Sequence, residues 1–116
     1  IRRHEDDHFV HSIAVGALSL NNSEHTIMRE GKSIKLTPTG FKILHILMSA
    51  APRVVSKTEL EEKVWGLDIP SSDALRTHMH SVRAQVDKPF DKTMIVTVPG
   101  VGYQIIDPNK SEHAVV

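Results

Sequence analysis

Apolar side chains return at helical spacing in three consecutive stretches between residues 38 and 87, and a strand-turn-strand pattern follows them. In the third stretch the apolar residues fall at i, i+4, i+7 and i+11, namely Leu75, Met79, Val82 and Val86. They share a narrow stripe on one side of a helix, and such a stripe must be buried against another element. The third stretch therefore predicts a helix over about 71–87 with one buried face and one outward face.

Capping residues mark the starts of the two earlier helices. Thr37 is a good N-cap and Pro38 suits the first helical position, which predicts a first helix over about 38–51. Ser56 and Glu59 form a Ser-x-x-Glu capping box ahead of the second apolar stretch. The second helix is therefore expected to begin at this box.

Strand patterns flank the helical region on both sides. Residues 9–20, 25–30 and 33–36 are separated by turn signals and predict a small antiparallel sheet at the N-terminus. Residues 94–98 and 103–106 flank a Pro-Gly-Val-Gly turn and predict a C-terminal hairpin. The order predicts an α+β fold of the winged helix-turn-helix type, with a three-helix core, an N-terminal antiparallel sheet and a β-hairpin wing.

Length and composition favour one domain. With 116 residues, 40% of them hydrophobic, the chain can bury one core. We expect residues 1–8 to be a linker, 9–106 to be the domain and 107–116 to be a flexible tail. The chain begins at Ile1 without an initiator methionine, so we expect it to be part of a longer protein.

Cysteine is absent, which excludes disulfides and thiolate metal sites, and no apolar run approaches the roughly 18 residues of a membrane span. We therefore expect a soluble, cytoplasmic protein that makes no membrane contact.

The charge balance gives mixed evidence about a nucleic-acid partner. Fourteen basic and fourteen acidic side chains give a formal charge of zero, which counts against a strongly electrostatic binder. Residues 29–106 nevertheless hold eleven Lys/Arg against eight Asp/Glu, whereas residues 1–28 hold two against four. Arg76, His80 and Arg83 lie to one side of the apolar stripe of the third helix. A helix about 10 to 12 Å wide fits the DNA major groove, so this outward face can meet DNA while the hairpin reaches the backbone or the minor groove.

Five blocks, in order and with the right spacing, resemble the signature blocks of OmpR/PhoB-type response-regulator effector domains. They are LTPTGFKIL (36–44), RVVSKTEL (53–60), VWG (64–66), THMHSVR (77–83) and TVPGVGY (97–103). The resemblance covers roughly residues 13–106, and no single block has to carry it.

The resemblance implies a cytoplasmic transcription factor, the output domain of a two-component response regulator, that binds double-stranded DNA in a sequence-specific way. The third helix (about 71–87) would read the major groove and the wing (about 94–106) would touch the minor groove. A receiver domain phosphorylated on aspartate would precede this domain in cis, and family members usually bind tandem half-sites as homodimers. They commonly contact RNA polymerase through the loop that corresponds to residues 66–71. No cofactor, metal or catalytic residue is implied.

The resemblance also assigns candidate contacts residue by residue. Major-groove contacts are expected from the third helix, at Arg76, Thr77, His80, Ser81 and Arg83. Phosphate and wing contacts are expected at Trp65, His78, Thr97, Val101 and Tyr103.

Four positions depart from the family pattern. The family usually has arginine where Asp73 stands, a basic residue at Ser81, a wing arginine at Pro99 and glutamate at Gly40. Asp73 and Ser81 remove two cationic contacts and Pro99 removes a minor-groove arginine, so affinity and its salt dependence should be lower than in a strongly basic member. Arg76 stands where the family often has an acid, and arginine can grip guanine O6 and N7, so we expect an altered base preference. The other possibility is that DNA binding has been lost.

Several residues have a second interpretation. Trp65 is either a phosphate-contacting donor or a core aromatic, or both. His4, His8 and His11 near three acids suggest a metal-responsive segment, although it lacks the fixed geometry of a selective site.

Catalysis has little support in the sequence. The Gly-x-Gly turn before Tyr103 is followed by a strand, so it lacks the helix that a phosphate loop needs. The chain contains no nucleophile elbow or paired-acid motif, and we expect no enzyme. The alternative to a DNA-binding regulator is a winged helix retained as a protein-interaction module with weak or lost DNA binding.

Overall fold

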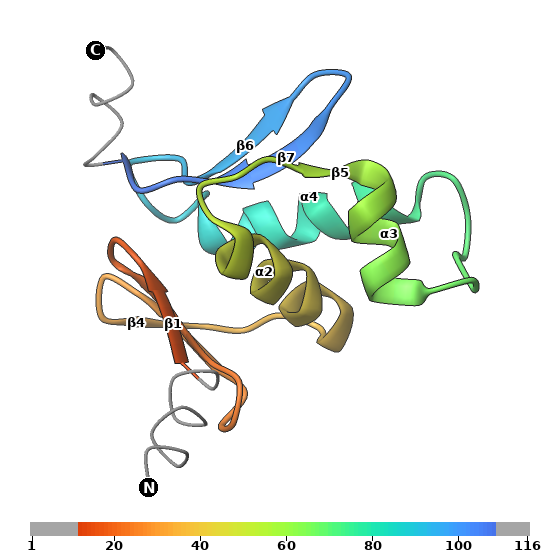
Figure 1. The fold of residues 1–116 in the computed structure, drawn as a ribbon. Helices are drawn as coiled ribbons and strands as arrows, with labels where there is room; N and C mark the ends of the chain where they lie inside the picture. Colours follow the sequence, from red (N-terminus) through yellow and green to blue (C-terminus); the bar gives the residue numbers. More distant parts are fainter. Residues whose placement is uncertain (1–11, 109–116) are drawn as a thin grey trace, which may run out of the picture.

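The computed structural model describes residues 12–108, which form three helices and two antiparallel sheets (Figure 1). Their order is β1 (Ser12–Val15), β2 (Leu18–Asn21), β3 (Thr26–Arg29), β4 (Lys32–Ile34), α2 (Pro38–Ala50), β5 (Val55–Ser56), α3 (Lys57–Trp65), α4 (Ala74–Val86), β6 (Ile95–Val98) and β7 (Gly102–Ile105). The expected α+β winged helix is confirmed. The expected linker (1–8), the N-terminal histidines and most of the expected tail lie outside the described residues.

The N-terminal sheet is a four-stranded meander in the order β1-β2-β3-β4. The expected strand over 9–20 is wrong within the described residues, because a turn at residues 16 and 17 divides it into β1 and β2. Gly16 has φ +57°, and a Cβ there would lie 2.7 Å from Asp107 Oδ1. Glycine therefore supplies both the turn conformation and the space beside Asp107.

Helix α2 forms as its capping residues predict. Thr37 Oγ1 accepts a hydrogen bond from the Gly40 amide at 3.1 Å, and Pro38 occupies the first turn. The helix buries one face in the core, with Phe41, Ile43, Leu44, Leu47 and Met48.

Helix α3 begins at the predicted capping box. Ser56 Oγ accepts from the Glu59 amide at 3.0 Å. The Glu59 carboxylate binds the guanidinium of Arg53 at 3.3 Å and Lys63 Nζ at 3.2 Å. The helix ends at Trp65, before Gly66 with φ +66°.

Helix α4 begins later than the sequence suggested. Residues 70–73 are exposed and the helix starts at Ala74, with Asp73 in the N-cap position making no side-chain capping bond. The early start was wrong because Pro70 and the two serines can open a loop as well as a helix. The predicted stripe is confirmed, because Leu75, Met79, Val82 and Val86 are at most 1% exposed.

The wing is a three-stranded sheet in the order β5-β7-β6, and strand β5 was not predicted. Val55 pairs with Tyr103 and Ser56 with Gly102. A Cβ on Gly102 would lie 2.0 Å from the Val55 carbonyl oxygen, so glycine allows β5 to approach β7. The segment that joins α2 to α3 is thereby hydrogen-bonded to the wing.

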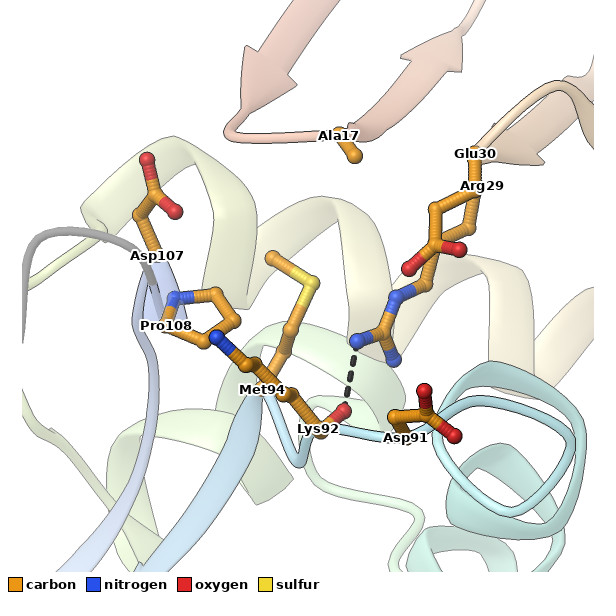
Figure 2. Close-up of a pocket in the computed structure, with 8 residues that line it drawn as sticks. All are labelled: Ala17, Arg29, Glu30, Asp91, Lys92, Met94, Asp107 and Pro108. Carbon is orange, nitrogen blue, oxygen red and sulfur yellow. Dashed lines mark hydrogen bonds between the residues drawn. The ribbon is translucent and has the colours of Figure 1, made fainter.

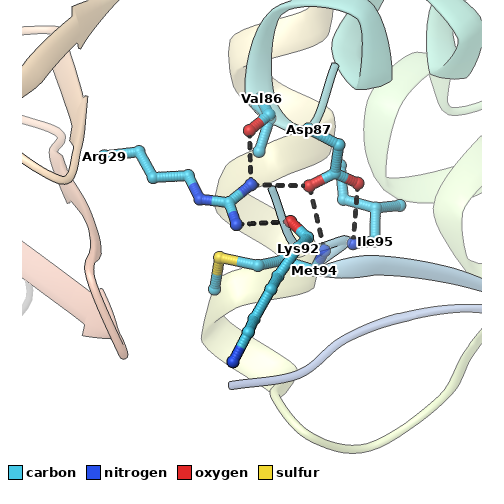
Figure 3. Close-up of polar contacts among 6 residues, drawn as sticks. All are labelled: Arg29, Val86, Asp87, Lys92, Met94 and Ile95. Carbon is cyan, nitrogen blue, oxygen red and sulfur yellow. Dashed lines mark hydrogen bonds and ion pairs between the residues drawn. The ribbon is translucent and has the colours of Figure 1, made fainter. Parts of the chain in front are cut away.

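A buried ion pair joins the N-terminal sheet to the far end of α4 and the start of the wing (Figure 3). Arg29 Nη1 donates to Asp87 Oδ1 at 2.9 Å and to the Val86 carbonyl at 2.6 Å, and Nη2 donates to the Lys92 carbonyl at 2.5 Å. Asp87 also accepts from the amides of Met94 and Ile95 at 2.9 and 3.1 Å. The pair therefore fixes where β6 begins relative to the end of α4.

Candidate nucleic-acid interface

The outward face of α4 is exposed to solvent. Thr77, His80 and Ser81 are exposed, on the opposite side from the buried stripe. The helix lies next to the wing hairpin, as Figure 1 shows. This arrangement presents polar side chains of the helix and the tip of the hairpin to solvent.

Arg76 is the most exposed cation on this face. Its side chain is 79% exposed, and Nη2 donates to Asp73 Oδ1 at 3.2 Å. An exposed pair three residues apart on a helix stabilises the fold by little. The contact therefore matters for the position of the guanidinium more than for folding.

The side chain of Arg83, a residue of α4, contacts the wing. Its Nη2 donates to Thr97 Oγ1, and its guanidinium carbon lies 5.9 Å from the centroid of the Tyr103 ring. Thr97 and Tyr103 are directly opposite each other on β6 and β7. Three expected contact residues therefore converge at the place where the helix meets the hairpin.

Trp65 and His78 form a second pair. Both are half-buried, and their rings lie 5.8 Å apart at 48°. Trp65 at the end of α3 also packs against the hydrophobic core. Trp65 is therefore a core aromatic, as one of its two interpretations expected, and part of its side chain remains exposed.

The tip of the wing stands apart from the other candidate residues. Val101 is 54% exposed, beside exposed Pro99 and Gly100 with φ +76°. A hydrogen bond from the Val101 amide to the Val98 carbonyl closes the turn at 2.9 Å. The tip therefore presents the apolar side chains of Pro99 and Val101 to solvent.

The loop between α3 and α4 is exposed throughout residues 66–73. Leu67 is fully exposed and Ile69 is 40% exposed. Lys57 Nζ donates to the Ser72 carbonyl at 3.5 Å, which holds the end of the loop near the start of α3. The loop therefore presents two aliphatic side chains to solvent.

Arg53, Glu59 and Lys63 form a charge cluster at α3, outside the α4 face. The hydrogen bond from Arg53 holds the pKa of the Glu59 carboxyl below its ordinary value, and the bond from Lys63 acts in the same direction. The same bond with Glu59 raises the pKa of Arg53. The cluster neutralises part of its own positive charge.

Sequence reasoning missed Arg29 and Asp87. A signal was present, since Arg29 follows buried Ile27 by two residues on β3 and therefore faces the same side of the strand. A charged residue on the inner face of a strand requires a partner. Nothing in the chain pattern indicated that the partner would be Asp87, 58 residues away.

A polar pocket of about 180 Å³ lies beside this ion pair (Figure 2). It is lined by Ala17, Arg29, Glu30, Asp91, Lys92, Met94, Asp107 and Pro108. None of the ten candidate contact residues lines this pocket. The helix face and the wing, not a cavity, therefore form the candidate site.

Neither a metal-binding cluster nor a membrane-spanning helix is found within residues 12–108. This part of the chain holds no group of three or more His, Asp or Glu side chains arranged for a metal ion. His4, His8 and His11 lie outside it. Within the same range, none of the helices has the length and apolar character needed to cross a bilayer.

Comparison with known proteins identifies similar domains. The family model described as "Transcriptional regulatory protein, C terminal" matches residues 31–105. The DNA-binding response regulator MtrA of Mycolicibacterium smegmatis is 33% identical over 110 residues, which are 93% of this chain and 48% of MtrA. This chain spans about half the length of the curated relatives it matches.

Solved structures show the same arrangement. The C-terminal domain of the nisin resistance regulator NsrR, a lantibiotic response regulator, is 36% identical with a TM-score of 0.71, over 84% of this chain and 99% of that one. The DNA binding domain of CpxR from E. coli is 28% identical with a TM-score of 0.71, over 83% of this chain and 96% of that one.

Proposed function

Because this chain belongs to the family of transcriptional regulatory protein C-terminal domains, of the OmpR/PhoB type, we propose that it binds DNA sequence-specifically and regulates transcription. The observation that carries the proposal is the exposed face of α4 beside the wing, with Arg83 joined to Thr97 and Tyr103 at their junction. This surface has the dimensions and the polar character for a helix in the major groove with a hairpin at the adjacent backbone.

Individual roles follow from where the side chains lie. Arg76, Thr77, His80 and Ser81 are exposed on α4 and would contact base edges. Thr97, Tyr103 and Trp65 lie near the ends of neighbouring elements, and His78 lies on α4 beside Trp65. These four residues would contact phosphates. Arg83 would contact both base edges and phosphates. Val101 would approach the minor groove through apolar contact alone.

The whole protein would extend beyond this domain. A cytoplasmic, non-enzymatic response regulator would carry a receiver domain in cis before residues 9–106, joined through residues 1–8. It would bind tandem half-sites as a homodimer. The exposed loop with Leu67 and Ile69 would contact RNA polymerase.

The proposal is tested by selection from random DNA duplexes at low salt and then at physiological salt. A repeated half-site recurring at about one helical turn is the expected result. Arg76→Ala should weaken binding to that site by about 1–3 kcal/mol with a smaller loss on random DNA, because it removes a base contact. Lys35→Ala removes one positive charge outside α4 and the wing and serves as the control.

Thr97→Val should weaken binding to selected and random DNA equally, because it removes a phosphate contact. Equal losses on both DNAs for Arg76→Ala would contradict its base-reading role.

A second candidate function is a protein-interaction module without DNA binding. Zero formal charge and the exposed Leu67 and Ile69 favour it. The log-log salt slope of DNA binding separates the two functions, since each phosphate contact contributes about −0.9 to it. No DNA retained at low salt would support the interaction module.

A further inference from the structure

A carboxylate stands at the N-terminal end of the α4 face that would meet DNA. The Asp73 side chain is 71% exposed and directly precedes Ala74, the first residue of the helix. The N-terminal residues of a recognition helix commonly lie closest to base edges, where phosphates flank the groove. A carboxylate at this position repels the phosphates of DNA unless a bonded cation compensates its charge.

Asp73 binds Arg76 and does not cap its helix. Aspartate is among the best N-cap residues, because its carboxylate can accept from the free amides of the first turn. Here the carboxylate accepts from Arg76 Nη2 at 3.2 Å and makes no capping bond. The side chain is therefore oriented toward the cation one turn along the helix.

The backbone around Asp73 is held on both sides. The Ala74 amide donates to the Ser71 carbonyl at 3.3 Å, and the Thr77 amide donates to the Asp73 carbonyl at 3.0 Å. Lys57 Nζ reaches the Ser72 carbonyl at 3.5 Å. The carboxylate therefore projects from a fixed point, which allows it to restrict the rotamers of a long arginine side chain.

The chemistry of guanidinium permits a double role for Arg76. Guanidinium has five N–H donors, and a bidentate contact with guanine O6 and N7 uses two of them. The bond to Asp73 occupies one NH2 group at one oxygen. Arg76 can therefore stay bound to Asp73 while it reads a guanine.

We propose that Asp73 is a positioning residue that sets the sequence specificity of this domain. It orders Arg76 for a guanine edge, and it lowers affinity for DNA that offers no guanine there. On a matching site the charge of Asp73 is compensated by an Arg76 that is fully bonded. On other sequences the repulsion between Asp73 and the phosphates has no compensating base contact. The inference rests on the proposed DNA-binding function and deepens it.

The test compares Asp73→Asn, Arg76→Ala and the double variant with the unsubstituted domain. Asp91→Asn is the matched control, since it removes one exposed negative charge beyond the end of α4. Each protein is titrated with the selected duplex, the same duplex with single base changes, and random duplex, at several salt concentrations. Thermal unfolding of each variant confirms the fold, which an exposed residue without a capping bond should not alter.

Asp73→Asn should bind random duplex about threefold more tightly, because a negative charge near phosphates is removed. It should also lose at least about threefold of its preference for guanine at one position, because asparagine keeps an acceptor oxygen but lacks the charge that holds Arg76. In the Arg76→Ala background, Asp73→Asn should leave base preference unchanged. Asp91→Asn should change neither quantity by more than about half of these amounts.

Three results would overturn the inference. Unchanged or increased guanine preference in Asp73→Asn would mean that Asp73 only competes with DNA for Arg76. An equal effect of Asp91→Asn would mean that net charge alone is responsible. If the unsubstituted domain retains no DNA at low salt, the proposed function fails first and the inference fails with it.

Discussion

Replacing Asp87 with alanine should destabilise the domain more than any surface change. Asp87 is 9% exposed and its carboxylate serves three donors, Arg29 and the amides of Met94 and Ile95. Removing it leaves a guanidinium buried to 1% exposure without its counter-charge, and two amides at the start of β6 without that acceptor. The consequence falls on folding, because these groups lie away from the outward face of α4.

The expected loss in the free energy of unfolding is about 4 kcal/mol. Breaking a buried ion pair by removing one partner costs about 3–5 kcal/mol, and each buried amide left unbonded costs about 1–3 kcal/mol. Arg29 keeps its bonds to the carbonyls of Val86 and Lys92, which offset part of this cost. Domains of this size are stable by about 5–15 kcal/mol, so the loss is a large share of the total.

Urea denaturation followed by circular dichroism measures the effect. With a slope of about 2 kcal/mol per molar urea, the midpoint should fall by about 2 M. Asp91→Ala, at an exposed position nearby, should shift stability by less than about 0.5 kcal/mol. The double variant Arg29→Met/Asp87→Leu should recover the part of the loss that comes from the unpaired guanidinium, because apolar residues can replace a buried pair, but not the part that comes from the two unbonded amides.

The reasoning would be refuted by a midpoint shift below about 0.5 M for Asp87→Ala with an unchanged slope. Such a result would mean that water or a shifted backbone satisfies Arg29 as well as the carboxylate does. A double variant no more stable than Asp87→Ala would show that the pair is needed for its geometry and not only for charge balance.

Two further predictions concern the wing and the charge cluster at α3. Gly102→Ala should cost about 3 kcal/mol or more by thermal unfolding, since its Cβ would overlap the Val55 carbonyl and separate β5 from β7. Gly31→Ala, with φ +78° and open space around its Cβ, should cost only about 1 kcal/mol, so equal losses would contradict the steric argument. Glu59→Gln should flatten the acid limb of the stability profile. The lowered pKa of Glu59 means that its contribution is present above the usual glutamate pKa of about 4.3 and is lost as pH falls through the lowered value. An acid limb identical to that of the unsubstituted domain would mean that the cluster with Arg53 and Lys63 does not stabilise the fold.

Local chemistry in the sequence predicts the helices well. Thr37 with Pro38 and Ser56 with Glu59 are caps whose bonds are made within three residues, and both helices begin where these signals stand. The stripe on α4 depends on spacing alone, and all of its members are buried. Such features need no knowledge of the rest of the fold.

Features that depend on distant partners were not predicted. Strand β5 has two residues and becomes a strand only because Gly102 on β7 admits it. The division of residues 12–21 into two strands depends on Gly16, which fits a partly alternating strand pattern as well as a turn. Asp87 looked like part of a helix end, and its pairing with Arg29 exists only in the folded chain.

The candidate site was predicted as a set of residues but not as a geometry. Sequence spacing placed Arg83 on the outward face of α4 with Arg76. The structure places its guanidinium against Thr97 and Tyr103, which come from strands that helical periodicity cannot locate. The pairing of Asp73 with Arg76 was within reach of the sequence, since both lie three residues apart near one helix end.

Ser56 has two structural roles, because it pairs with Gly102 in the wing sheet and caps the first turn of α3. The base of the hairpin is thus built into the helical core, whereas Pro99, Gly100 and Val101 project beyond the paired residues. The base and the tip of the hairpin can therefore change at different rates during evolution. Substitutions or insertions at the tip can alter what the tip contacts without rearranging the helices, while changes at the base disturb both. Divergence among related regulators should accordingly concentrate at the tip and spare the residues that join it to α3.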